Sequence, residues 1–308
     1  MNPRLLQIGP LSEGLQARLA QWPVTSLWRE PADHLSRYGG DYDVVVTSAR
    51  HGLSEAQLAQ LPRVRAICSF GVGSDAICVA AAQARGIRVS VTPDVLNDCV
   101  ADLALGLILA TARQLPASDR FVREGRWAAG AYPLTRRVSG KRLGIVGLGR
   151  IGEQIALRAT GFAMPMRYHS RRPHPQHGDS HEPDLLALAR WADFLVLACP
   201  GGAATHHLID AAVLDALGPQ GVLINIARGS VVDEAALVAA LREGRLGGAG
   251  LDVFEHEPQV PSELFELPNV VLLPHVGSGT VETRQAMEQL LLDNLAAFLR
   301  DGEVLTPP

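Results

Sequence analysis

Three segments place a polar residue directly after an apolar run, where a buried core has no use for one. Arg228 follows Ile226 and Ala227, Glu257 comes shortly after Leu251-Asp252-Val253-Phe254, and His275 follows Leu272-Leu273-Pro274. An arginine can bind a carboxylate with two parallel hydrogen bonds and polarise a neighbouring carbonyl group. A histidine can give a proton to the carbonyl oxygen, while a carboxylate orients its ring and stabilises its charged form. These three residue types suit the reduction of a carbonyl group that stands next to a carboxylate.

Each of these residues also has a simpler explanation when it is taken alone. Arg228 could be a surface charge at a helix end, Glu257 an exposed loop acid before Pro258, and His275 a hydrogen-bonded histidine of the core. The combination is more informative, because the carboxyl ends of the strands line the ligand crevice of an open α/β sheet. We therefore expect the three side chains to gather at one edge of a parallel sheet.

A glycine-rich segment provides a candidate dinucleotide site. It reads Gly147-Leu148-Gly149-Arg150-Ile151-Gly152, follows the apolar run 143–146 and opens an amphipathic helix over 151–160. A strand before and a helix after are the context that this fingerprint requires. The glycines allow a tight turn close to a pyrophosphate, and the helix N-terminus supplies N–H groups for the anion. The alternative is a turn that only packs the helix on the strand.

The residues after the next expected strand favour NADP(H) over NAD(H). An NAD site normally has Asp or Glu there, which accepts a hydrogen bond from the ribose 2′-hydroxyl. This chain has Tyr168-His169-Ser170-Arg171-Arg172, with no carboxylate. A carboxylate would repel a 2′-phosphate, whereas Ser170 and two guanidinium groups would bind it. The alternative is that Arg171 and Arg172 are solvated loop charges.

Short apolar runs alternate with helical patterns along most of the chain, which predicts βαβ units with parallel strands. The expected strands are 5–8, 44–47, 64–70, 87–91, 143–146, 166–169, 194–199, 222–227, 249–254 and 270–273. The expected helices are 11–22, a short one capped by Ser54 and Gln57, 76–85, 98–114, 151–160, 185–189, 211–217, 234–243 and 281–300. Residues 117–139 contain several arginines and show no clear period, so we interpret them as an arm or linker.

Composition limits the possible functions. A length of 308 residues favours two domains, and a net charge of -4 without a basic stripe argues against nucleic acid as a partner. No apolar run approaches the roughly 20 residues of a membrane span, and no secretory signal is evident. The four cysteines lack metal or redox spacing, which fits a cytoplasmic protein. A metal site at His174, His177 and His181 is a weaker alternative, because scattered loop histidines are usually solvated; we expect no metal.

Taken together, the motifs resemble those of the D-isomer-specific 2-hydroxyacid dehydrogenases. The similarity is greatest to the NADPH-using branch of glyoxylate/hydroxypyruvate and hydroxyphenylpyruvate reductases, and it runs through nearly the whole chain. The matching segments are Ser69-Phe70-Gly71-Val72-Gly73, Thr92-Pro93-Asp94-Val95-Leu96, Gly147 to Gly152, Ser170-Arg171-Arg172, Asn225-Ile226-Ala227-Arg228-Gly229, Gly250-Leu251-Asp252-Val253-Phe254-Glu255 and Pro274-His275-Val276-Gly277-Ser278-Gly279-Thr280. Ser74 departs from the family, which often has a larger apolar residue there.

The resemblance implies an α/β fold with two Rossmann-like or flavodoxin-like domains and an active site in the cleft between them. Residues 1–98 plus 282–308 would form the substrate domain. Residues 99–281 would bind NADP(H), with an arm at about 117–140 in a homodimer interface. The implied reaction is NADPH-dependent reduction of a small 2-oxo acid, glyoxylate or hydroxypyruvate, to the D-2-hydroxy acid. Alternatives are an aryl substrate of the hydroxyphenylpyruvate type and, from another class, a dinucleotide-sensing corepressor-like binding protein.

The resemblance also assigns roles to individual residues. Arg228 would anchor the substrate, Glu257 would be the partner of the histidine, and His275 would donate the proton. The backbone of Val72 and Gly73 would hold the substrate carboxylate. Cofactor contacts would come from Gly147, Leu148, Gly149, Arg150, Ile151, Gly152, Ser170, Arg171, Arg172, Ile226, Ala227, Arg228, Asp252, His275 and Gly277.

Overall fold

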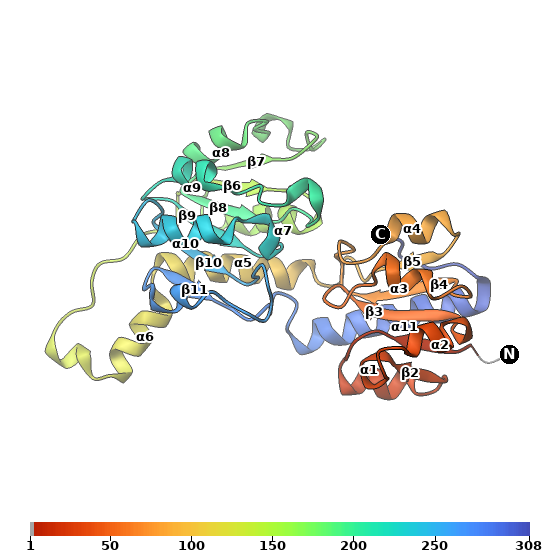
Figure 1. The fold of residues 1–308 in the computed structure, drawn as a ribbon. Helices are drawn as coiled ribbons and strands as arrows, with labels where there is room; N and C mark the ends of the chain where they lie inside the picture. Colours follow the sequence, from red (N-terminus) through yellow and green to blue (C-terminus); the bar gives the residue numbers. More distant parts are fainter. Residues whose placement is uncertain (1–2) are drawn as a thin grey trace. The chain divides into compact units, whose positions relative to one another are not determined.

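The computed structural model describes residues 3–308, which form two units, each built around a parallel β-sheet (Figure 1). Unit 1 consists of the described residues up to Leu96 together with Val281–Pro308, and unit 2 is Asn97–Thr280. The expected boundaries lie at 98/99 and 281/282. Which unit binds the substrate and which the cofactor stays a prediction at this point, as does an active site in a cleft between them.

Unit 1 has a five-stranded sheet in the order β2-β1-β3-β4-β5, the order of flavodoxin-like folds. Its strands are β1 (Leu5–Gln7), β2 (Val24–Ser26), β3 (Val44–Ser48), β4 (Ala66–Phe70) and β5 (Arg88–Ser90), and its helices are α1 (Glu13–Leu19), α2 (His34–Tyr38), α3 (Glu55–Ala59), α4 (Val79–Ala84) and α11 (Val281–Asp301). Helix α11 packs Leu291, Leu295 and Phe298 against the sheet residues Leu5 and Val44. The last helix of the chain therefore completes the core of the first unit.

Unit 2 has a six-stranded sheet in the order β11-β10-β9-β8-β6-β7. Its strands are β6 (Leu143–Val146), β7 (Met166–His169), β8 (Phe194–Leu197), β9 (Val222–Asn225), β10 (Gly248–Leu251) and β11 (Val270–Leu272). Its helices are α5 (Asn97–Ala112), α6 (Leu115–Arg123), α7 (Arg150–Thr160), α8 (Leu185–Trp191), α9 (Ala211–Leu217) and α10 (Glu234–Arg242). Strand order reverses between β6 and β8, because β7 lies on the far side of β6. Such a switch point is where open α/β sheets bind ligands at the carboxyl ends of their strands.

Short 3-10 helices complete the chain; they are η1 (Leu27–Arg29), η2 (Gly39–Asp41), η3 (Arg126–Ala129), η4 (Gly178–Ser180), η5 (Ala203–Thr205), η6 (Gly229–Val231) and η7 (Ser262–Glu266). Every strand pair in both sheets is parallel, so the predicted α/β class with parallel sheets is confirmed. The predicted capping box is also confirmed: Ser54 accepts from the Gln57 N–H, and the Gln57 side chain accepts from the Ser54 N–H.

Among the strands and α-helices, three elements were not expected from the sequence. Strand β2 and helix α2 have only three and five residues, which is too short for a period to show. Helix α6 lies in the segment that we interpreted as an irregular arm, and Pro116 stands in its first turn, where a missing N–H costs nothing. Helix α5 ends at Ala112, two residues before the expected end.

Among the described residues no single helix has the length and apolarity to cross a membrane; only α5 and α6 taken together meet that test, and they are bent by 57°.

Candidate active site

The strands of unit 2 end in register at one edge of the sheet. Leu197 is paired with Asn225, Asn225 with Leu251, and Leu251 with Leu272. The residues that follow these positions are therefore neighbours across the sheet. Arg228 follows β9, Asp252 to Glu257 follow β10, and His275 follows β11. The three polar segments expected from the sequence thus leave the same edge, on three adjacent strands.

His275 and Glu257 form a hydrogen-bonded pair at this edge. Nδ1 of His275 lies 2.8 Å from Oε2 of Glu257. The other carboxylate oxygen of Glu257 accepts a hydrogen bond from the Phe254 N–H at 3.2 Å, which fixes the carboxylate to its own loop. The His275 side chain is 43% exposed, whereas that of Glu257 is 21% exposed. The carboxylate is thus the inner member of the pair, and the imidazole faces outward.

Asp252 holds the loop that carries His275. Its two carboxylate oxygens accept hydrogen bonds from the N–H groups of Val276 (2.7 Å) and Gly277 (2.8 Å), and its carbonyl oxygen accepts from the His275 N–H at 2.8 Å. Burial raises the pKa of the Asp252 carboxyl, and the two N–H donors oppose that rise. His275 has a φ of 54°, a conformation rare for a residue with a side chain, so these three bonds stabilise a turn that the local sequence disfavours.

The turn that carries Arg228 is fixed by Asn225, the last residue of β9. The Asn225 side chain donates to the Arg228 carbonyl at 2.9 Å and accepts from the Ala227 N–H at 3.0 Å. Asn225 is 1% exposed, so these two bonds are shielded from water. Arg228 itself donates from Nη1 to the Ala227 carbonyl at 2.7 Å. Our sequence reasoning gave Asn225 no role, although an amide that ends the apolar run Val222-Leu223-Ile224 was a signal.

The glycine turn after β6 has the shape of a phosphate-binding turn. Gly147 has a φ of 95°, and a Cβ there would lie 2.7 Å from the Cα of Cys199. A Cβ on Gly152 would lie 2.3 Å from the Gly147 carbonyl oxygen, so this glycine lets α7 approach β6. A Cβ on Gly149 would meet nothing within 4 Å. The first and third glycines are therefore needed for packing, while the second borders open space at the N-terminus of α7, where a pyrophosphate fits.

The end of β7 presents the three residues proposed for the 2′-phosphate. Ser170 is half-buried and donates from Oγ to the Arg172 carbonyl at 2.5 Å, which closes a tight turn. Arg171 and Arg172 are exposed, and their guanidinium groups face solvent from a short loop. The arrangement leaves both cations available for an anion.

The predicted cofactor residues Leu148, Arg150, Ile151 and Ile226 lie in unit 2, on the glycine turn, the start of α7 and the segment after β9, whereas the two predicted substrate-binding residues lie in unit 1. Val72 and Gly73 follow β4, at the carboxyl end of the unit 1 sheet. Their loop is fixed by Gly71, whose N–H donates to Thr92 Oγ1 at 3.0 Å and whose carbonyl accepts from the Thr92 N–H at 2.8 Å. A contact of these two residues with substrate stays a prediction.

Comparison with known proteins identifies the family. Residues 105–277 match the model of the D-isomer specific 2-hydroxyacid dehydrogenase, NAD binding domain. The chain belongs to the D-isomer-specific 2-hydroxyacid dehydrogenase family. It is 48% identical to glyoxylate/hydroxypyruvate reductase A HPR2 of Arabidopsis thaliana and 47% identical to hydroxyphenylpyruvate reductase of Plectranthus scutellarioides, in each case over 98% of both chains. The 2-ketogluconate reductase of Gluconobacter oxydans is 42% identical over 99% of this chain and 98% of its own.

Solved structures of this family extend the comparison to the fold. The 2-hydroxyacid dehydrogenase of Ketogulonicigenium vulgare Y25 superposes with a TM-score of 0.92 and is 44% identical, with 100% of this chain and 98% of that chain covered. The NADPH-dependent glyoxylate/hydroxypyruvate reductase of Sinorhizobium meliloti, in complex with NADP and malonate, has a TM-score of 0.92 and 43% identity, covering 100% and 97%. The resemblance drawn from the sequence motifs is thus confirmed at the level of the family.

Proposed function

We propose that this dehydrogenase reduces a small 2-oxo acid, glyoxylate or hydroxypyruvate, to the D-2-hydroxy acid with NADPH as the reductant. The observation that carries the proposal is the His275–Glu257 pair, which lies at the same sheet edge as Arg228. The glycine turn after β6 belongs to the same sheet and fits a dinucleotide. A proton donor, a carboxylate anchor and a cofactor turn on one sheet are the parts that this reaction needs.

The side chains divide the chemistry between them. A bound reduced nicotinamide would supply a hydride to the carbonyl carbon of the substrate. Arg228 binds the substrate carboxylate and polarises the carbonyl bond. Because Nδ1 of His275 is bonded to Glu257, Nε2 is the ring nitrogen that gives its proton to the carbonyl oxygen. Glu257 stabilises the protonated imidazole, and in the oxidation direction the neutral imidazole accepts the proton back.

Two observations support NADPH as the cofactor. The turn after β7 offers Ser170, Arg171 and Arg172 and has no carboxylate at the position that would accept from a ribose 2′-hydroxyl. A guanidinium pair binds a 2′-phosphate through charge-assisted hydrogen bonds. The Sinorhizobium meliloti relative, which is named NADPH-dependent, was solved with NADP.

The substrate assignment depends on the relatives and on the donor set. Relatives that cover nearly all of the chain are named for glyoxylate, hydroxypyruvate, hydroxyphenylpyruvate and 2-ketogluconate. All of these compounds are 2-oxo acids, so Arg228 and the backbone of Val72 and Gly73 would serve each of them. An aryl substrate is the second candidate, because the hydroxyphenylpyruvate reductase is 47% identical.

A substrate panel distinguishes these candidates. We expect the purified protein to oxidise NADPH in the presence of glyoxylate or hydroxypyruvate with a higher kcat/KM than with hydroxyphenylpyruvate or 2-ketogluconate. A higher kcat/KM with hydroxyphenylpyruvate or 2-ketogluconate would contradict the assignment of a small substrate and favour a bulkier 2-oxo acid. Dinucleotide binding without turnover of any of the four would favour the corepressor-like alternative.

We also propose that residues 117–140 form part of a homodimer interface. In Figure 1 the segment after α6 projects away from the sheet of unit 2. It exposes apolar side chains, with Trp127 at 68% and Leu134 at 101% relative exposure. Exposed apolar side chains on one segment favour a protein contact. Light scattering should give a dimer for the wild type and a monomer for Trp127→Ser/Leu134→Ser; a monomeric wild type would contradict the proposal.

A further inference from the structure

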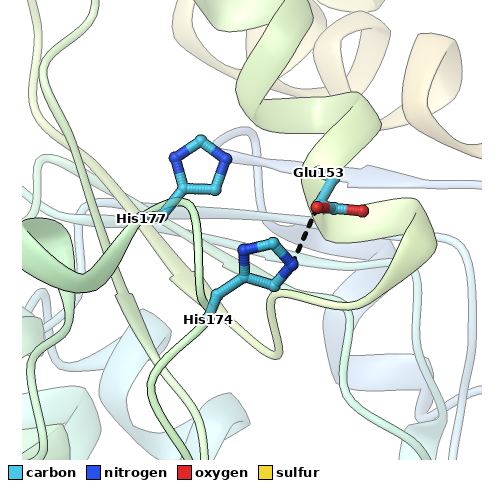
Figure 2. Close-up of side chains that lie close together, drawn as sticks. All are labelled: Glu153, His174 and His177. Atoms are coloured by element: carbon cyan, nitrogen blue, oxygen red, sulfur yellow. Dashed lines mark ion pairs between the residues drawn. The ribbon is translucent and has the colours of Figure 1, made fainter.

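The loop between β7 and α8 carries two histidines whose side chains lie beside a glutamate of α7. Figure 2 shows His174 and His177 from this loop turned toward Glu153, in the first turn of α7. Nε2 of His174 lies 2.9 Å from Oε1 of Glu153. One ligand atom from each of the three residues lies within 4.8 Å of those of the other two. We propose that Glu153, His174 and His177 bind a divalent transition-metal ion of the zinc type.

The donor set selects the class of ion. Two imidazole nitrogens and one carboxylate oxygen suit Zn²⁺ and its neighbours, whereas Ca²⁺ and Mg²⁺ prefer oxygen ligands throughout. Three protein ligands leave the fourth tetrahedral position to water. Ligand atoms around tetrahedral zinc are about 3.4 Å apart. The atoms of His174 and Glu153, 2.9 Å apart, would separate slightly, and no other pair has to close by more than about 1.4 Å, a shift of the size that a side-chain rotation can supply.

The backbone around the cluster is already fixed. The N–H of His174 donates to the hydroxyl of Tyr168, a fully buried residue of β7, at 2.6 Å. The N–H of His177 donates to the His174 carbonyl at 3.1 Å, so the segment His174-Pro175-Gln176-His177 is a closed turn. The N–H of Glu153 donates to the Gly149 carbonyl at 2.8 Å. The backbone of the three residues is therefore already ordered, so binding of an ion would need only their side chains to adjust.

An ion would replace the close polar contact between His174 and Glu153. At present Nδ1 of His174 accepts from the Gln176 N–H at 3.3 Å, which places the proton of a neutral ring on Nε2, the atom 2.9 Å from Glu153 Oε1. Coordination through Nε2 moves that proton to Nδ1 and breaks the contact with Gln176. This contact is long and lies in an exposed turn, so its loss costs little compared with a coordinate bond.

The third histidine expected from the sequence does not belong to the cluster. Nε2 of His181 lies 3.0 Å from the Ser170 carbonyl, and its ring packs against Tyr168. The structure therefore corrects the His174/His177/His181 combination: Glu153, which is more than 20 positions earlier in the chain, takes the place of His181.

A second group with similar spacing is less suited to a metal. One ligand atom each of His206, His207 and Glu255 lies within 4.8 Å of the others. The rings of His206 and His207 are stacked, with centroids 3.9 Å apart and planes inclined by 25°. At this separation the two rings are in face-to-face van der Waals contact, whereas the rings of His174 and His177 have centroids 5.3 Å apart and planes inclined by 34°.

Metal binding to the untagged full-length protein tests this site, which is independent of the proposed catalytic function. After dialysis against EDTA, the wild type should bind one Zn²⁺ per chain in calorimetry, and Co²⁺ should give the visible absorption of a tetrahedral complex. His177→Ala and Glu153→Gln should each weaken Zn²⁺ binding by about 10-fold or more, because even outer-shell partners cost that much. Thermal unfolding without metal confirms that the variants fold.

Two matched controls use the other histidines. His181→Ala removes an imidazole from the same loop, and His206→Ala removes one from the stacked pair; both should leave Zn²⁺ affinity unchanged. The proposal is overturned if the wild type shows no saturable Zn²⁺ binding. It is also overturned if His177→Ala binds Zn²⁺ as tightly as the wild type, or if His206→Ala is the variant that loses Zn²⁺ affinity.

Discussion

Nδ1 of His275 lies 2.8 Å from Oε2 of Glu257, and the second carboxylate oxygen of Glu257 is taken by the Phe254 N–H. Both oxygens of Glu257 thus accept a hydrogen bond, one from the imidazole and one from the backbone. This relationship gives the imidazole one defined proton on Nδ1 and leaves Nε2 for the substrate.

Glu257→Gln should lower kcat for reduction by about 10²-fold, the lower end of what general acid catalysis contributes. The glutamine keeps the size of the side chain, and its oxygen can still accept from Phe254 N–H. Its NH₂ group would then face Nδ1 of His275, which removes the acceptor that stabilises a protonated ring. Steady-state kinetics should show KM for the 2-oxo acid nearly unchanged. A kcat equal to that of the wild type would remove Glu257 from the mechanism.

Asn225→Asp should reduce kcat/KM by about 10- to 100-fold, because small displacements of a substrate anchor are costly. The aspartate can still accept from the Ala227 N–H, but its second oxygen would face the Arg228 carbonyl in place of a donor. The effect should appear as a higher KM for the 2-oxo acid. Asn269→Asp is the matched control, because Asn269 donates to Gly247 at the opposite end of the strands. Equal losses in the two variants would indicate a general loss of folding.

Gly149→Ala should weaken NADPH binding by about 10-fold or more, which is about 1.4 kcal/mol, without lowering the melting temperature. The φ of Gly149 is -94°, which alanine adopts freely, and the new methyl group would enter open space beside the N-terminus of α7. Gly147→Ala is the contrasting variant, because its φ of 95° and its contact with Cys199 predict a lower melting temperature. Unchanged NADPH affinity in Gly149→Ala would show that the dinucleotide does not approach this turn.

Arg171→Ala/Arg172→Ala should reduce the preference for NADPH over NADH by about 10- to 100-fold, since charge-assisted hydrogen bonds contribute about 1.5–3 kcal/mol each when they are shielded from water. Both guanidinium groups are exposed, so the effect should weaken as salt is added. Arg190→Ala removes an exposed cation from the last turn of α8 and serves as the control. The ratio of kcat/KM for the two cofactors is the measurement, and an unchanged ratio would contradict the NADPH assignment.

Asp193→Asn should destabilise unit 2 by about 1 kcal/mol at neutral pH, a value discounted for the exposed Arg142 side chain. The Asp193 carboxylate accepts from the Arg142 N–H at 2.8 Å and from its guanidinium at 3.1 and 3.2 Å. Burial raises the pKa of this carboxyl, but the hydrogen bonds from Arg142 lower the pKa by more. The pKa of Asp193 therefore lies below its usual value of 3.8.

A lowered pKa in the folded state means that the stabilisation is fully present above the unfolded value of 3.8 and is lost as pH falls through the folded pKa. The difference in the free energy of unfolding between wild type and Asp193→Asn should therefore be constant near pH 7 and shrink below 3.8. Urea unfolding at several pH values measures it, with Asp179→Asn as an exposed control. A difference that grows toward acid pH would contradict the sign.

Most of the fold could be predicted from the sequence because its signals are local. The glycine turn between an apolar run and an amphipathic helix identified β6 and α7, and the spacing of Ser54 and Gln57 identified the start of α3. Strand β2 and helix α2 were not predicted, because three to five residues are too few to show a hydrophobic period. Helix α6 was not predicted, because Phe121 is its one buried residue and a single apolar position shows no helical period.

The catalytic residues of the site could be predicted from the sequence, but the hydrogen bonds that hold them in place could not. Arg228, Glu257 and His275 stood out by residue type after apolar runs. The bonds of Asp252 to Val276 and Gly277 join residues more than 20 positions apart, and only the register of β10 and β11 brings them together. The same holds for Glu153, which meets His174 because α7 and the loop after β7 are neighbours in the fold.

The rate of NADPH oxidation with glyoxylate, measured side by side for the wild type and His275→Asn, tests the central claim most directly. Asparagine keeps a polar side chain but cannot carry the transferable proton. We expect turnover by the wild type, a loss of about 10²- to 10⁴-fold in kcat for the variant, and the same NADPH dissociation constant for both. A variant as active as the wild type, or a wild type without turnover of glyoxylate and hydroxypyruvate, would contradict the account.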